Sequence, residues 1–184
     1  MPNKKESDTV SSLPSDESNP TIASTEYSKG NKPPSSAPVQ IPISYPEDGM
    51  LTVEWIQDLT LTFDWSSRNL PPSEFPSVFP VDVFDTLVLT ASKILHKEPN
   101  CVVIDDFDQD SRVVVVGDVH GQLHDVLFLL RDAGFPSKNC FFVFNGDYVD
   151  RGAWGLETFL LLLAWKVMLL FLSYFLLLFI GDAK

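Results

Sequence analysis

The chain has 184 residues, room for one domain of ordinary size, and 45% of them are hydrophobic. Its formal net charge is -12, which argues against nucleic acid as the partner because phosphate backbones bind basic surfaces. Two cysteines, Cys101 and Cys140, are too few for a disulfide scaffold and indicate reduced thiols, without a disulfide partner, in an intracellular protein. The first thirty residues contain no apolar stretch, so we expect no secretory signal.

Composition divides the first hundred residues into two segments. Residues 1–50 hold 8 of the 14 prolines and 10 serines, and such a segment cannot bury enough apolar surface to offset its ordering entropy. We expect it to be a disordered leader. Residues 51–100 predict a helical segment, in which apolar side chains recur at helical spacing in two stretches, interrupted at 69–72 and stopped at Pro99. A short apolar strand is predicted next, at 101–104.

The following residues repeat one unit, an apolar strand that leads into a polar loop. The β-branched run 113–116 predicts a buried strand, and the polar residues Asp118 and His120 come directly after it. One helix later, the apolar run 140–144 leads into Asp147. Parallel strands joined by a crossover helix end at the same edge of a sheet, where ligands bind in open α/β folds. We therefore expect the three polar side chains to meet.

This combination of side chains indicates a metal site. The carboxylates of Asp118 and Asp147 with the imidazole of His120 form a mixed oxygen and nitrogen site, which suits Mn, Fe or Zn better than calcium. Arg151, four residues after Asp147, offers a planar fork of donors that suits a phosphate oxyanion.

The two loops also carry a family resemblance. Gly117-Asp118-Val119-His120-Gly121 and Gly146-Asp147-Tyr148-Val149-Asp150-Arg151-Gly152 resemble the first two signature motifs of the phosphoprotein phosphatase (PPP) metallophosphoesterases. The stretch from Phe63 to Val167 is similar to the plant type-7 branch of that family. The resemblance implies an α/β fold, part of the calcineurin-like metallophosphatase β-sandwich flanked by helices. It also implies phosphoprotein substrates, whose serine or threonine phosphate esters are hydrolysed by a water that two divalent metals activate.

The resemblance assigns a role to each polar residue of the two motifs. Asp118 and His120 would bind the first metal, and Asp147 would bridge both metals. Asp150 would orient a catalytic histidine without touching a metal itself. Arg151 would grip the substrate phosphate.

The third motif of the family, Gly-Asn-His-Glu, is missing from this chain. It would supply an asparagine ligand and the histidine that protonates the leaving group. This chain has no asparagine after Asn145 and no histidine after His124, which we interpret as a helix-face residue. We therefore expect at most one metal site, no general acid and an inactive chain.

The apolar segment 159–180, where Lys166 is the only charged residue, has two interpretations. As one helix it would reach about 33 Å, enough to make a single-pass membrane protein. Alternatively, residues 154–167 pack on the sheet and complete a partial catalytic domain at 101–167. Residues 168–184 would then be an exposed apolar tail foreign to the family, in a truncated isoform or gene product located in the nucleus or cytoplasm. The sequence favours the second interpretation.

Overall fold

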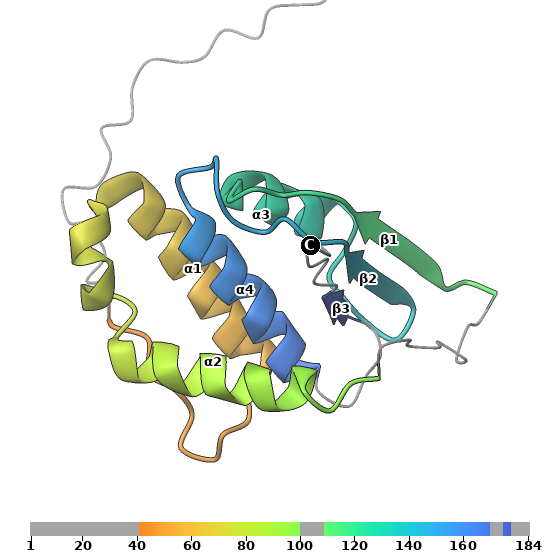
Figure 1. Cartoon of the computed structure of the whole chain (residues 1–184), viewed down its shortest axis with the longest axis horizontal. Helices are drawn as coiled ribbons and strands as arrows, with labels where there is room; N and C mark the ends of the chain where they lie inside the picture. The colour runs from red at the N-terminus through yellow and green to blue at the C-terminus, as the bar shows by residue number, and fades with distance from the viewer. Residues whose placement is uncertain (1–40, 100–108, 170–174, 178–184) are drawn as a thin grey trace, which may run out of the picture. The chain divides into compact units, whose positions relative to one another are not determined.

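The computed structural model describes residues 41–99, 109–169 and 175–177, which all fall in one unit of the chain, residues 38–184. The helices and strands follow the chain in this order (Figure 1): α1 (Val53–Asn69), the 3-10 helix η1 (Pro72–Ser77), α2 (Val81–Leu95), β1 (Arg112–Val116), α3 (Leu123–Asp132), β2 (Cys140–Phe144), α4 (Gly155–Met168) and β3 (Phe175–Leu177). The predicted α/β class is confirmed.

The structure has helices at both positions that the apolar spacing predicts, α1 and α2. α1 begins after Thr52, whose side-chain oxygen accepts a hydrogen bond from the backbone N–H of Trp55 at 3.2 Å. It ends at Asn69, just before two prolines that cannot continue a helix. Most of the predicted leader, residues 1–40, and the predicted strand at 101–104 lie outside the described residues.

The three strands form one parallel sheet in the order β1-β2-β3. α3 is the crossover between β1 and β2, as the sequence predicts. The two strands are in register, with Val116 opposite Phe144, so both end at the same level. The loops that follow them therefore begin side by side.

The run 113–116 forms a strand, as predicted, but the expectation that this strand is buried was wrong for two of its residues. Val113 is 42% exposed and Val115 70% exposed, whereas Val114 and Val116 pack against the core. β1 stands at one edge of the described sheet, and among the described residues the face that carries Val113 and Val115 is exposed. β2, between two strands, matches the expectation, since Phe141, Phe142 and Phe144 in it are fully buried.

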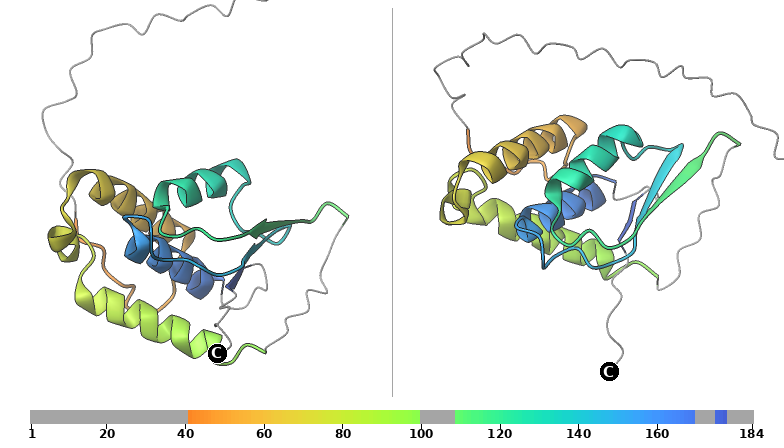
Figure 2. Two further views of the ribbon diagram at one scale, coloured as in Figure 1. Left: turned by 45° about the horizontal axis from the view of Figure 1, so that its top comes forward. Right: turned by 90° about the horizontal axis from the view of Figure 1, so that it is seen from above.

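α4 is the central helix of the described fold. It lies among α1, α2, α3 and β3 and contacts each of them (Figures 1 and 2). Every residue from Leu160 to Val167 is buried. A helix that is apolar on all sides is expected where neighbours cover it on all sides. This packing accounts for the apolar character of 160–167 inside the fold.

The apolar segment 159–180 is not one helix. α4 ends at Met168, and residues 175–177 form β3, which pairs in parallel with β2. Within the described part of the chain, no helix combines the length and the apolar composition needed to cross a membrane. The expectation of an exposed apolar tail at 168–184 was also wrong in part, because β3 adds to the sheet and Leu169 is buried.

Candidate metal centre

The site is built by the loops that follow β1 and β2, and backbone hydrogen bonds join these two loops. The N–H groups of Val119 and His120 both donate to the carbonyl of Asp147, at 3.1 and 2.8 Å. Further along, the N–H of Gly152 donates to the carbonyl of His120 at 2.8 Å. Because these bonds connect main chain to main chain, they fix the relative positions of the two motifs whatever the side chains do.

The three predicted metal ligands converge. His120 Nε2 lies 3.7 Å from Asp118 Oδ2 and 3.8 Å from Asp147 Oδ2, and the three ligand atoms are all within 4.8 Å of one another. The carboxylate side chains are 61% and 67% exposed, whereas that of His120 is 18% exposed. The site is thus a partly buried imidazole between two carboxylates that face solvent.

The other nitrogen of the His120 ring sets its orientation. His120 Nδ1 lies 3.1 Å from the backbone carbonyl of Val149. A carbonyl can only accept, so Nδ1 carries the proton in this contact. In the neutral ring Nε2 then has a free lone pair, and it points between the two carboxylates. A metal-binding histidine is commonly held in this way, with its second ring nitrogen bonded to a carbonyl or carboxylate.

Unusual backbone conformations are concentrated at the site. In the described residues, positive φ angles outside glycine occur at four positions, all in the two motifs: His120 (42°), Asp147 (41°), Asp150 (64°) and Arg151 (54°). Each left-handed residue costs on the order of 1–3 kcal/mol and persists only where the surrounding structure requires it. Here the hydrogen bonds between the two loops hold these residues in the left-handed conformation.

Asp150 and Arg151 lie on the same loop as Asp147, and both are exposed. Asp150 is not among the three converging ligands. In the part of the chain that the structure describes, no second group of three or more potential ligands occurs. The residues present thus fit one divalent cation, with the exposed Arg151 on the loop that carries Asp147.

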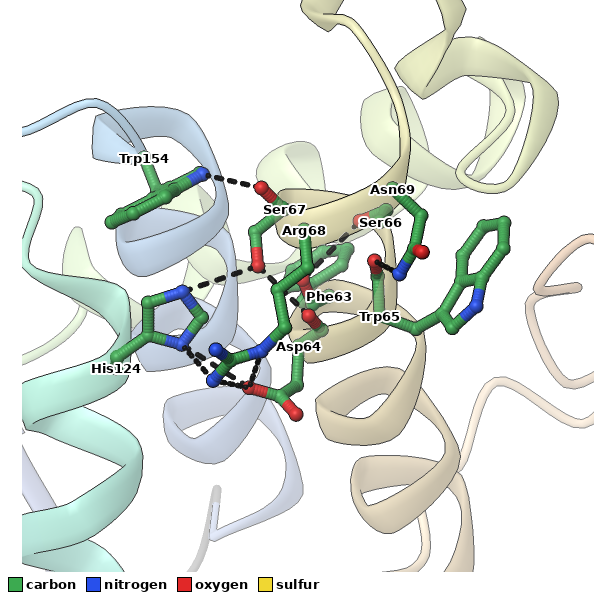
Figure 3. Close-up of polar contacts among 9 residues, drawn as sticks. All are labelled: Phe63, Asp64, Trp65, Ser66, Ser67, Arg68, Asn69, His124 and Trp154. Atoms are coloured by element: carbon green, nitrogen blue, oxygen red, sulfur yellow. Dashed lines mark hydrogen bonds and ion pairs between the residues drawn. The ribbon is translucent and has the colours of Figure 1, made fainter. Parts of the chain in front are cut away.

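His124, predicted to lie on a helix face, is in the first turn of α3 and belongs to a polar cluster with side chains of α1 (Figure 3). Its Nδ1 lies 3.1 Å from Asp64 Oδ1 and 3.0 Å from Arg68 Nη2. The ring also meets the Trp154 indole edge-on, with ring centroids 4.5 Å apart. The partners in α1 are 56 and 60 residues away, which explains why no local pattern revealed them.

Charges within this cluster lower the pKa of one carboxyl group, that of Asp64. Burial acts to raise the pKa of Asp64, but the hydrogen bond and positive charge of Arg68, together with His124, outweigh it. The pKa of Asp64 is therefore held below its ordinary value of 3.8. Asp64 is thus an anion that links α1 to the start of α3.

The cluster also contains a serine, a histidine and an aspartate that contact one another in the sequence Ser–His–Asp, as in serine hydrolases. Ser67 Oγ lies 3.4 Å from His124 Nε2, yet it donates to the backbone carbonyl of Asp64 at 2.9 Å. A hydroxyl bonded to its own helix in this way has no free proton for the imidazole. We therefore interpret the cluster as structural.

Comparison with known proteins agrees with the two motifs. Residues 111–178 match the calcineurin-like phosphoesterase family, and this match extends beyond Val167, where the sequence resemblance ends. Serine/threonine-protein phosphatase 7 of Arabidopsis thaliana is 68% identical over 128 residues, which cover 70% of this chain and 31% of the plant protein. A long form homolog from the same plant is 64% identical over 130 residues and 10% of its length.

A solved structure is also similar to this chain. It is a serine/threonine phosphatase from Saccharomyces cerevisiae, described as similar to human phosphatase PP5. The match has a TM-score of 0.51 at 26% sequence identity and covers 69% of this chain and 37% of the yeast protein. This chain therefore spans about a third or less of the curated plant relatives and little more than a third of the yeast structure.

Proposed function

We propose a function in phosphate binding and metal binding for this chain, whose residues 111–178 belong to the calcineurin-like phosphoesterase family and whose relatives are serine/threonine phosphatases. In this proposal Asp118, His120 and Asp147 hold one divalent cation, Mn, Fe or Zn. The ligands are proteins that carry phosphoserine or phosphothreonine, the substrates of a complete enzyme of this family. The 184-residue polypeptide by itself carries half of a two-metal site.

The observation that carries the proposal is the orientation of His120. Its Nδ1 is engaged with the Val149 carbonyl, and its Nε2 faces two carboxylates at 3.7 and 3.8 Å. Without a cation, those two carboxylates would repel each other across the imidazole. A divalent cation offsets this repulsion, and oxygen and imidazole ligands suit transition metals.

Arg151 is proposed to bind the phosphate. It is exposed, and its left-handed backbone is fixed by the same loop that carries Asp147. The planar guanidinium can donate two parallel hydrogen bonds to a phosphate oxyanion. When bound, metals in this family supply an activated water and stabilise the charge on the phosphoryl oxygens.

We propose that the 184-residue chain does not turn over phosphate esters. The sequence has no histidine after His124 to protonate the leaving oxygen, and loss of a general acid typically costs a hundred- to ten-thousand-fold in rate. The buried free thiol of Cys140 fits the reducing interior of a cell, nucleus or cytoplasm, where phosphoprotein substrates occur.

Manganese titration of the full chain tests the metal site. We expect one Mn bound per chain by isothermal titration calorimetry, and we expect His120→Ala to abolish binding. His96→Ala is the matched control, because His96 is exposed and caps α2 away from the motifs. Two tight sites, or equal binding by the His120 and His96 variants, would contradict the proposal.

Phosphate binding and hydrolysis are measured separately. With Mn present, inorganic phosphate should bind to the wild-type chain and bind at least tenfold more weakly to Arg151→Ala, because a charge-assisted bidentate contact is lost. An aryl phosphate should not be turned over. Hydrolysis that disappears in His120→Ala would show that the chain is a complete enzyme and would overturn the half-site proposal.

A further inference from the structure

A pocket lies next to the second motif loop, where α1 ends and α4 begins. Its volume is about 410 Å³. The side chains that form its apolar walls come from three places: Leu70 and Pro71 after α1, Phe75 in η1, and Trp154 immediately before α4. None of these residues has a role in the metal centre.

The pocket contains one ionisable lining residue, Glu157, in the first turn of α4. Burial raises the pKa of Glu157, although a hydrogen bond from its own backbone N–H acts in the opposite direction. In the described part of the chain no cation forms an ion pair with this carboxylate. A half-buried carboxylate without a counter-charge favours a positively charged occupant.

Trp154 connects this pocket to the phosphate-binding loop. It is three residues after Arg151, and its backbone N–H donates to the carbonyl of Gly121 at 3.3 Å. Its indole Nε1–H donates to the carbonyl of Ser67, also at 3.3 Å, and the ring packs against His124 (Figure 3). The pocket wall is therefore fixed to both motif loops and to α1.

We infer that this pocket binds the side chain of a lysine or arginine that flanks the phosphorylated residue of the substrate. Such a side chain has an apolar stem, which matches Leu70, Pro71 and Phe75, and a cationic end, which matches Glu157. Trp154 also lines the pocket, and its indole can add a cation–π contact. The inference deepens the proposed function, because it assumes that Arg151 holds the phosphate.

The test uses fluorescein-labelled phosphoserine peptides with an alanine background, each carrying one lysine at a different distance from the phosphoserine. A second set carries norleucine in place of lysine, which keeps the stem and removes the charge. Binding to the full chain is followed by fluorescence anisotropy with Mn present. We expect lysine at one or two neighbouring positions to tighten binding about fivefold over norleucine, as for a partly desolvated ion pair.

Glu157→Gln should remove that gain and leave binding of the all-alanine phosphopeptide unchanged. Glu74→Gln is the matched control, because Glu74 is an exposed residue of η1, close to the pocket but not lining it, and should keep the gain. A gain that survives Glu157→Gln, or no preferred lysine position among peptides that do bind, would overturn the pocket inference alone. No binding of any phosphopeptide or of inorganic phosphate would overturn the proposed function, and this inference with it.

Discussion

The same added methyl group should destabilise the protein at Gly152 and leave it nearly unchanged at Gly117, two glycines of the motifs. A Cβ at Gly152 would lie 2.3 Å from the carbonyl oxygen of His120 and 2.5 Å from that of Gly121. Real Cβ atoms are essentially never found closer than 3.0 Å to another atom. At Gly117 a Cβ would meet nothing within 4 Å.

The magnitude at Gly152 follows from these distances. The obstructing atoms are backbone, so they cannot rotate away, and the two loops must separate by about an ångström. Overpacking of this kind costs on the order of 1–3 kcal/mol, and the hydrogen bond from Gly152 N–H to the His120 carbonyl adds about 1 kcal/mol when it is lost. Because His120 moves with its carbonyl, we expect Gly152→Ala to weaken Mn binding at least tenfold, which corresponds to about 1.4 kcal/mol.

Gly117→Ala is the control for changes in the entropy of the unfolded chain, since both variants replace a glycine by alanine and restrict that chain equally. We expect its stability to stay within about 0.5 kcal/mol of wild type, with Mn affinity unchanged. Urea unfolding without metal and Mn titration of each variant provide the two measurements. Equal losses in the two variants, or wild-type Mn affinity in Gly152→Ala, would refute the argument that the loops are joined by close backbone contact.

Three further predictions concern stability. Phe142→Ala should lower the free energy of unfolding by about 3–5 kcal/mol in urea, because Phe142 is fully buried in β2; a loss below 1 kcal/mol would contradict the described core. Asp64→Asn should be less stable than wild type at pH 7, and the difference should vanish as pH falls below 3.8, because the lowered pKa of Asp64 stabilises the fold only while the carboxylate is charged; a pH-independent difference would refute this. Glu157→Gln should unfold at a higher temperature than wild type at pH 7 and lose this advantage near pH 4.5, since the raised pKa of Glu157 penalises the charged form; the reverse order would be inconsistent with its burial.

The convergence of Asp118, His120 and Asp147 could be predicted from sequence because it depends on topology alone. Two in-register parallel strands joined by one helix must end at the same edge of a sheet, whatever packs around them. The exposure of Val113 and Val115 could not be predicted in the same way. A run of β-branched residues indicates a strand, but it does not say how many faces of that strand other elements cover.

The parts of the site that depend on distant contacts were not predictable. His124 meets α1 through Asp64 and Arg68, and Trp154 forms the wall of a pocket with residues that precede it by more than 75 positions. One weak feature of the sequence pointed to these contacts: the polar residues Ser67 and Arg68 at the end of an otherwise amphipathic helix. The short strand β3 was hidden for another reason, because its leucines and phenylalanine lie in a longer apolar run whose composition fits a helix equally well.

The strained residues suggest why α1 and α4 matter to the site even though they supply no ligand. His120 and Asp147 adopt left-handed backbones at a cost of about 1–3 kcal/mol each, and this cost must be offset by structure that is already in place before a metal arrives. The offset comes from the hydrogen bonds between the loops, and the second loop continues directly into Trp154 and the buried helix α4. Trp154 in turn is bonded to Ser67 of α1. α1 and α4 therefore support the two loops and hold the ligands in position, so that cation binding needs little rearrangement of the backbone.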